Sequence, residues 1–288
     1  MKAKHLALLL LLGGCAPFGL SPAPIRVGAF LDAEPALIFE AAEAGVTAVC
    51  LPGVAGRIVH YSLGGENILW NNPDAQGKDR PQGGYGLDLG PEMRGLPRHA
   101  AIWEAPHQWG LLAGGVATVA SGADAALGMK VDKQVALDAV TGNLEIIQRM
   151  RNISGAEQAY CIWDRTLCKS GGWTLIPLNR KSRFPARWVL GKRLTPAKWA
   201  YDGVSPSHPN MKVIDDLLVV RSIGPEQKVG ADSDAGWIAY VRGRLLFVKY
   251  FPYTPDGLYS DGGLSVAHYY NDRIAELEPI SPEVRLPP

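Results

Sequence analysis

Two glutamates near the C-terminus are spaced for a shared chemical role. Glu276 and Glu278 are separated only by Leu277. In a β-strand, alternate residues point to the same face of the sheet, so the two carboxylates would lie together and Leu277 would point the other way. Carboxylates that share one face can form a site for binding or for acid–base chemistry. The alternative is that both are simply solvated on an exposed strand.

A second cluster combines aromatic and ionisable side chains. The segment from His99 to Trp109 contains two histidines, two tryptophans and Glu104. Sugar sites need this mixture, because the apolar C–H faces of pyranose rings stack on indole while the hydroxyls bond to His, Glu, Gln and Arg. The segment therefore predicts a carbohydrate site. The alternative is a buried tryptophan beneath a loop, with histidines that bond within the protein.

The elements that must position these groups are predicted to be strands. The chain has 288 residues, of which 47% are hydrophobic, and its 33 Gly and 22 Pro separate short apolar runs. Residues 144–150 have a period of two, as in a half-buried strand. Residues 240–241 and 245–248 flank Gly243 and predict a hairpin. No long amphipathic helix is evident, so we expect one large β domain.

Two polar segments are predicted to be long loops. Residues 71–95 are rich in glycine, and a loop of that length is usually functional or mobile. Residues 180–198 contain seven Lys or Arg and are interrupted by prolines. These cations could form an anion-binding edge, although such a run is more often simply solvated.

The N-terminal residues resemble the signal of a bacterial lipoprotein. Lys2 and Lys4 precede an apolar run at residues 6–12, which is shorter than a bilayer-spanning helix, and Gly13-Gly14-Cys15 follows. In such signals the cysteine thiol carries the lipid, so Cys15 is the predicted lipidation site. An ordinary secretory signal with an incidental cysteine is the alternative.

These signals divide the chain into three parts. We expect a leader over residues 1–14, a lipidated cysteine with a Pro-rich tether over 15–32, and a single β-sandwich domain over 33–288. Ala16 resembles an outer-membrane address, so we expect the protein in the bacterial envelope, anchored by lipid in the outer membrane and facing the periplasm. Removal of the leader changes the formal net charge from +1 to −1. A near-neutral domain argues against nucleic acid as a partner.

Three cysteines remain beyond the signal, so at most one disulfide can form. Cys161 and Cys168 would be the pair if the chain bends between them. Otherwise Cys50 and these two are buried, inert thiols. No Cys/His cluster has the spacing of a zinc site, and the sequence predicts neither a metal nor a cofactor.

Several short motifs occur in an order that resembles one family. They are Gly56-Arg57-Ile58, Gly65–Trp70, Ile102–Pro106, Arg151–Ser154 leading to Trp163, Gly236-Trp237 with Phe247-Val248-Lys249, and Glu276–Pro279 with Pro282. Over the whole mature chain this order resembles the family called domain of unknown function 4380, which looks like the galactose-mutarotase superfamily. The resemblance implies an all-β fold, a β-supersandwich of antiparallel sheets, and a carbohydrate ligand.

The resemblance also implies roles for particular residues. Aldose mutarotases open and close a sugar hemiacetal with a His acid and a Glu base on opposite sides of the anomeric centre. Carried onto this chain, Glu278 is the implied base and His99 the implied acid, with His107 as the substitute if His99 faces away. Further residues predicted to bind the sugar are Arg57 or Arg94, Trp103 as a stacking wall, Asp261 and Glu276.

Two departures from the family pattern leave the function open. His99 and Trp103 lie one residue further apart than in the family, and Ala267 stands where the family tends to have a glutamate. The missing carboxylate would fit a binding module without turnover, or a site in which Asp261 acts instead. The predicted function is thus an envelope-anchored sugar epimerase or related enzyme, or else a non-catalytic glycan- or envelope-binding lipoprotein. A structural surface protein without a ligand is a third alternative.

Overall fold

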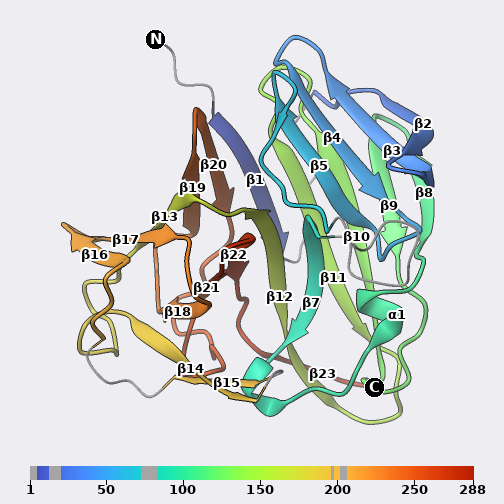
Figure 1. Cartoon of the computed structure of the whole chain (residues 1–288). Coiled ribbons are helices and arrows are strands. Elements are labelled where there is room, and N and C mark those ends of the chain that lie inside the picture. Colours follow the sequence, from blue (N-terminus) through green and yellow to red (C-terminus); the bar gives the residue numbers. More distant parts are fainter. Residues whose placement is uncertain (1–4, 13–20, 73–82, 196–197, 202–205) are drawn as a thin grey trace.

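The computed structural model describes residues 5–12, 21–72, 83–195, 198–201 and 206–288, and for residues 5–12 and 198 it describes the backbone alone. Regular structure in this part of the chain is almost entirely β-strand (Figure 1). Its two short helices are the 3₁₀ helix η1 (Glu92–Arg94) and the α-helix α1 (Ala100–Trp103). Neither is long and apolar enough to cross a membrane. The predicted all-β class is confirmed.

The strands form two large sheets. The first has ten strands, in the spatial order β16 (Met211–Ile214), β17 (Leu217–Ser222), β13 (Gly172–Pro177), β19 (Trp237–Arg242), β20 (Leu245–Tyr250), β1 (His5–Leu12), β11 (Leu144–Asn152), β10 (Met129–Leu137), β9 (Val116–Ala120) and β8 (Gln108–Leu112). The second has thirteen strands, and its main path is β15 (Lys198–Tyr201), β14 (Val189–Thr195), β18 (Gln227–Ala231), β21 (Val266–Tyr270), β22 (Ile274–Pro279), β12 (Gln158–Lys169), β7 (Tyr85–Gly90), β5 (Arg57–Leu63), β4 (Val46–Leu51), β3 (Ala33–Ala41) and β2 (Ile25–Phe30). Off this path, β23 (Val284–Leu286) pairs with β12, and β6 (Glu66–Asn67) pairs with β5.

An apolar core lies between the two sheets. Phe39 and Leu277 enter it from the thirteen-stranded sheet, and Ile146 and Phe247 enter it from the ten-stranded sheet. All four side chains are fully buried. Burial of each such side chain stabilises the fold by roughly 1.5–3 kcal/mol. The core therefore holds the two sheets together as a sandwich.

Several strands lie where the sequence pattern predicts them. β11 covers the period-two run at residues 144–150. β19 and β20 form the predicted hairpin, with Val241 opposite Leu246. Gly243 in its turn has φ of 60°, a conformation that glycine adopts at little steric cost. β22 holds Glu276 and Glu278 in extended chain, as their spacing predicts.

Parts of the two predicted loops are strands. Within residues 71–95, Tyr85–Gly90 forms β7 in the interior of the thirteen-stranded sheet, between β5 and β12. Leu87 and Leu89 are buried there, and the neighbouring glycines obscured this alternation in the sequence. Within residues 180–198, the strand β14 begins at Val189. Residues 73–82 lie outside the described part of the chain.

At the N-terminus, two strands overlap the segments that were predicted to be leader and tether. Strand β2 lies within the segment assigned to the tether, because Ile25–Phe30 pairs with β3, so the sandwich begins before residue 33. β1 overlaps the predicted leader and pairs in parallel with β11 and β20. Cys15 and the other residues from 13 to 20 lie outside the described residues. The leader and its lipidation site stay predictions.

The three described cysteines are free and buried. Cys161 and Cys168 lie in the same strand, β12, seven positions apart. An extended chain separates such residues by roughly 23 Å and points them to opposite faces, so they cannot form a disulfide. The disulfide alternative is therefore wrong, and the buried-thiol alternative is confirmed.

Candidate active site

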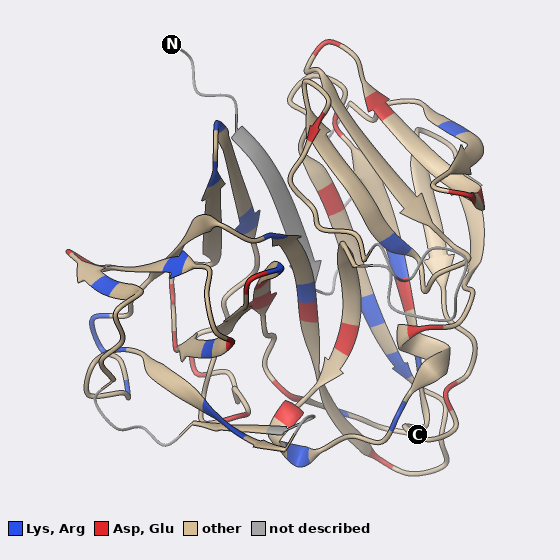
Figure 2. Cartoon of the chain, viewed as in Figure 1, with Lys and Arg blue, Asp and Glu red and all other residues tan. Residues whose placement is uncertain are grey.

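The candidate site lies on the face of the thirteen-stranded sheet that points away from the core. In β22, Leu277 belongs to the core, so Glu276 and Glu278 point to the opposite face. The neighbouring strand β12 sends Trp163 and Arg165 to that same face, where they bond to the two glutamates. Figure 2 shows acidic and basic residues on the central strands β7 and β12. Charged side chains are unusual in a sheet interior, so the row of charges formed by Glu276, Glu278 and Arg165 makes this face a candidate site.

Strand β7 adds one carboxylate to this face between two glycines. Asp88 lies opposite Trp163 in the sheet, and Gly86 and Gly90 lie two residues to either side of it. A Cβ atom at Gly86 would come within 2.7 Å of Arg57 Nη1, and one at Gly90 within 2.7 Å of the Trp163 ring. The glycines therefore leave room for larger side chains from adjacent strands to lie across β7.

A cavity of about 380 Å³ opens over this face. Its wall includes Asp88 of β7, Glu92 of η1, His99 just before α1, Trp163 and Arg165 of β12, and Thr195 of β14. The volume is in the range of pockets that bind small molecules. The cavity thus brings an imidazole, carboxylates, a guanidinium and an indole together from distant parts of the chain.

Hydrogen bonds link His99 to the row of charges. Its Nε2 lies 2.6 Å from Asp88 Oδ1, and its Nδ1 lies 2.8 Å from the carbonyl oxygen of Pro97. Arg165 donates to the other oxygen of Asp88 at 3.2 Å and to Glu276 at 2.7 Å. Because both ring nitrogens of His99 face acceptors, the doubly protonated imidazolium satisfies both contacts.

The charges around His99 favour that protonated form. Burial lowers the pKa of His99, but the hydrogen bond and the negative charge of Asp88 outweigh it and raise the pKa above its ordinary value. Burial likewise raises the pKa of Asp88, yet the bond from His99 and the charge of Arg165 bring it below the ordinary range. His99 is therefore held as an acid at the cavity wall.

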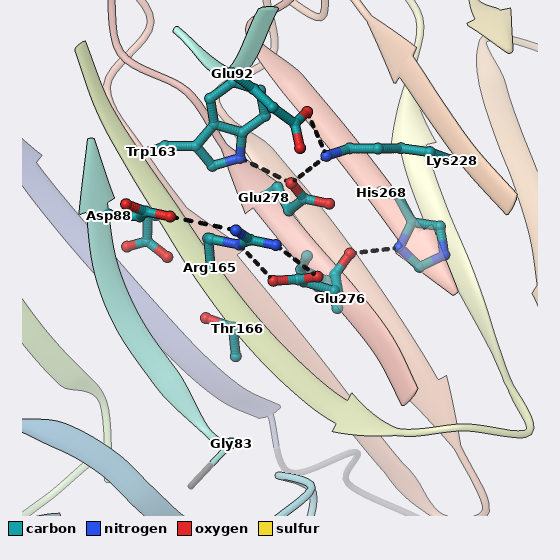
Figure 3. Close-up of polar contacts among 12 residues, drawn as sticks. Gly83, Asp88, Glu92, Trp163, Arg165, Thr166, Lys228, His268, Glu276 and Glu278 are labelled. Atoms are coloured by element: carbon teal, nitrogen blue, oxygen red, sulfur yellow. Dashed lines mark hydrogen bonds and ion pairs between the residues drawn. The ribbon is translucent and has the colours of Figure 1, made fainter. Parts of the chain in front are cut away.

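A second chain of contacts connects Glu92 to Glu278 (Figure 3). Lys228 Nζ lies 2.7 Å from Glu92 Oε2 and 3.0 Å from Glu278 Oε2. The indole N–H of Trp163 donates to the same oxygen of Glu278 at 2.8 Å. Glu278 is fully buried, and its Oε1 has no hydrogen-bond partner among the described residues.

Its surroundings give Glu278 an unusual affinity for a proton. Burial raises the pKa of Glu278 to about 7, with the negative charge of Glu276 adding to the shift and Lys228 opposing it. In Glu276, by contrast, Arg165 outweighs the effect of burial and lowers the pKa. Two carboxylates of one strand thus titrate apart, as occurs when an acid–base site needs one of them near neutral pH.

The predicted stacking wall and the predicted arginine lie beside the cavity. The Arg57 guanidinium lies 4.0 Å from the centre of the Trp103 ring, and the Arg165 guanidinium lies 5.4 Å from it. Arg57 is buried, and burial together with the charge of Arg165 lowers its pKa to about 10. Trp163, rather than Trp103, is the indole in the cavity wall.

Three predicted residues lie elsewhere or have another role. His107 is buried and contacts the Ile102 carbonyl at 3.2 Å, and burial and the charge of Lys133 lower its pKa to about 3. Arg94 pairs with Glu283 and is absent from the cavity wall. Asp261 accepts hydrogen bonds from the backbone N–H groups of Glu92 and Met93 at 2.7 and 2.8 Å. It therefore positions η1, and both of its oxygens are occupied.

The departure at position 267 has a local explanation. Ala267 lies opposite Glu278 in the sheet and is fully buried in an apolar cluster with Leu264, Val189 and Trp163. A glutamate here would put a charge among apolar side chains. Ala267 therefore contributes apolar packing, and no carboxylate, to this face.

Five residues of the candidate site were not predicted as site residues from the sequence. They are Asp88, Glu92, Trp163, Arg165 and Lys228. Trp163 and Arg165 carried the same signal as the glutamates, since they are two apart in a strand pattern. Nothing in the sequence near Glu92 or Lys228 indicates that they meet.

No family model matches the chain, and neither does any of the curated proteins. Solved structures with a similar fold include a galactose mutarotase-like protein from Lactobacillus casei, at 9% identity and a TM-score of 0.60, with 88% of this chain and 95% of that chain covered. A putative aldose 1-epimerase from Escherichia coli has 9% identity and a TM-score of 0.56, covering 88% and 94%. A galactose mutarotase-like protein from Clostridium acetobutylicum has 10% identity and a TM-score of 0.51, covering 93% and 95%. At these identities the likeness shows the fold alone, and the chain accordingly has the galactose mutarotase-like β-sandwich fold.

Proposed function

We propose that the cavity binds a carbohydrate and that the protein interconverts the anomers of an aldose or a related sugar. The observation that carries this proposal is the convergence of His99, the carboxylates of Asp88 and Glu92, and the Trp163 indole on one cavity of a mutarotase-like fold, with Glu278 bonded to that indole from beneath. A pyranose would lay its apolar face on the indole and bond its hydroxyls to Asp88 and Arg165.

The chemistry is a pair of proton transfers. A carboxylate takes the proton from the anomeric hydroxyl while the imidazolium of His99 gives a proton to the ring oxygen, and the bond between that oxygen and the anomeric carbon breaks. Rotation about the next carbon–carbon bond and reversal of both transfers close the ring as the other anomer. For His99 to act, the sugar oxygen must replace the Pro97 carbonyl as the acceptor on Nδ1.

Glu278 is the proposed base. Its pKa near 7 and its open Oε1 suit a general base at neutral pH. Because Glu278 is fully buried, contact with the sugar requires the Trp163 indole to shift. Glu92 already lies in the cavity wall on the other side of Lys228, so it is the second candidate for this role.

Two matched variants test which of these two carboxylates is the base. In Glu278→Gln we expect anomer exchange, measured by proton NMR, to fall by about 100-fold or more, while the affinity for the sugar, measured by calorimetry, changes less than tenfold. Glu92→Gln should retain most of the exchange rate. Loss of exchange in Glu92→Gln with retention in Glu278→Gln would transfer the role of base to Glu92.

The alternative function is glycan binding without turnover. The apolar environment of Ala267 favours it, because the carboxylate that the family resemblance leads one to expect there is missing. Wild-type protein that binds an aldose in calorimetry but leaves its anomer exchange at the uncatalysed rate would establish this alternative. Absence of both binding and exchange would exclude both functions.

We also propose that the protein is a lipoprotein anchored through Cys15 in the outer membrane and facing the periplasm. The motif Gly13-Gly14-Cys15 after an apolar run supports this. Growth with an alkyne-tagged palmitate should label the wild-type protein but not Cys15→Ser. Equal labelling of the two, or no labelling of either, would contradict the anchor.

A further inference from the structure

A second cavity, of about 260 Å³, is formed by three loops. They follow β13, β18 and β20, and they contribute Lys181 and Arg183, Asp232, and Tyr253 with Gly263. The loop after β20 also contains Asp261, which holds η1 at the first cavity. The two cavities thus share one supporting loop, but the residues in their walls differ.

The structure shows which cations of the basic segment 180–198 are available to a ligand. Arg180 and Arg187 both pair with Asp216, at 2.6 and 2.7 Å, so they share the single negative charge of that carboxylate. Lys181 has no ion-pair partner among the described residues. Arg183 comes no closer than 3.7 Å to a carboxylate oxygen, which belongs to Asp232. Lys181 and Arg183 therefore carry weakly compensated charge into the cavity wall.

Arg183 is held in place by its surroundings. Asp232 is buried and accepts hydrogen bonds from the backbone N–H of Arg183 at 2.8 Å and from the Ser182 hydroxyl at 2.6 Å. Gly263 has φ of 94°, and a Cβ atom there would collide with the Arg183 guanidinium. Glycine at this position therefore provides the space that the guanidinium occupies beside the backbone.

An aromatic surface forms another part of the cavity wall. The rings of Tyr253 and Tyr259 stack with centroids 5.5 Å apart and an angle of 8° between their planes. Tyr259 is buried, and its hydroxyl accepts a hydrogen bond from Thr254 N–H at 2.9 Å. The Tyr259 ring therefore packs against one face of Tyr253, and Tyr253 remains partly exposed.

Polar groups complete the cavity wall. Asn179 uses its side-chain oxygen to accept a bond from Lys181 N–H, and its amide N–H groups donate to no acceptor among the described residues. The Asp256 carboxylate accepts no hydrogen bond from the described residues and also lies in the wall. A donor and an acceptor beside an aromatic ring are what sugar hydroxyls require.

The geometry points to a second binding site, for an anionic sugar. The sugar ring would lie against Tyr253, its hydroxyls would bond to Asn179 and Asp256, and its carboxylate or phosphate group would bond to Lys181 and Arg183. Charge-assisted hydrogen bonds of this kind are the strong ones, so the anionic group would set the specificity. This site goes beyond the proposed function, because none of its residues takes part in the anomer chemistry.

Calorimetry with galactose, galacturonate and galactose 6-phosphate tests this proposal. We expect the wild-type protein to bind at least one of the two anionic sugars about tenfold or more tightly than galactose, because a charge-assisted hydrogen bond contributes more than one factor of ten. Whichever anionic sugar binds more tightly identifies the group as a carboxylate or a phosphate. The double variant Lys181→Gln/Arg183→Gln should lose the preference for the anionic sugar.

Two control variants test whether the preference for the anionic sugar arises at this second cavity. Arg180→Gln removes a neighbouring cation that is already paired with Asp216, and it should keep the preference. His99→Asn alters only the first cavity and should keep it too, so failure of the proposed function leaves this test intact. Equal affinity for galactose and both anionic sugars, a preference that survives the double variant, or its loss in Arg180→Gln would each overturn the proposal.

Discussion

Replacing His99 by asparagine is expected to slow anomer exchange by about 10²–10⁴-fold, which is the usual contribution of a positioned general acid. Asparagine can still bond to Asp88, so the cavity should keep its shape, but it cannot donate a proton to the ring oxygen. Exchange rates measured by proton NMR, with sugar affinity measured in parallel by calorimetry, check this result.

The pH dependence of the same reaction follows from the shifted pKa values of Glu278 and His99. The rate should rise with pH as Glu278 loses its proton, which its raised pKa places near pH 7. It should fall again as His99 loses its proton, at a pH above the ordinary value for histidine because Asp88 raises the pKa. In His99→Asn the fall at high pH should disappear.

A histidine outside the cavity provides the control for this prediction. His208 accepts a hydrogen bond from the backbone N–H of Asn210 and is absent from the cavity wall. His208→Asn should leave the exchange rate and its pH profile unchanged. An exchange rate in His99→Asn within about threefold of the wild type would remove His99 from the mechanism.

The largest expected effect on stability comes from Lys249, at the core face of β20. Its ammonium group is fully buried, pairs with Asp164, and lies 2.7 Å from the Thr166 hydroxyl. In Lys249→Met, Asp164 would keep the bond from Gln148 but would remain buried without its ion-pair partner. Breaking a buried pair in this way lowers the free energy of unfolding by about 3–5 kcal/mol. Urea denaturation of the two proteins measures the difference.

Two further variants test whether the loss arises from the orphaned charge. Lys249→Met/Asp164→Leu removes both charges and should recover much of the stability, since apolar side chains can replace a buried pair. Arg180→Gln breaks an exposed pair that solvent screens, and it should leave the urea midpoint close to that of the wild type. A loss below about 1 kcal/mol in Lys249→Met would show that the buried pair does not stabilise the sandwich.

The sequence was sufficient to predict the class of fold and the shared face of Glu276 and Glu278. The period of two in a strand was enough to place Glu276 and Glu278 on one face. Asp88 and Trp163 are adjacent through the register of β7 and β12, 75 positions apart in the chain, and no local pattern encodes that register. Residues that meet across strands were therefore missed.

The histidines show a second limit of sequence patterns. His99 and His107 lie in the same short aromatic segment, and only the family resemblance made His99 the preferred candidate for the acid. The turn of α1 separates them, because His107 N–H bonds to the Pro52 carbonyl at 2.8 Å and the chain carries its side chain inward. Four helical residues thus decide which histidine reaches the cavity.

The most direct test of the account is proton NMR of anomer exchange with the wild-type chain and a panel of aldoses. The account predicts that exchange of at least one aldose accelerates in proportion to the protein concentration, and that the same sugar shifts the indole N–H resonance of Trp163. Uncatalysed exchange for every aldose, with the Trp163 resonance unmoved, would contradict the assignment of this cavity as a sugar site.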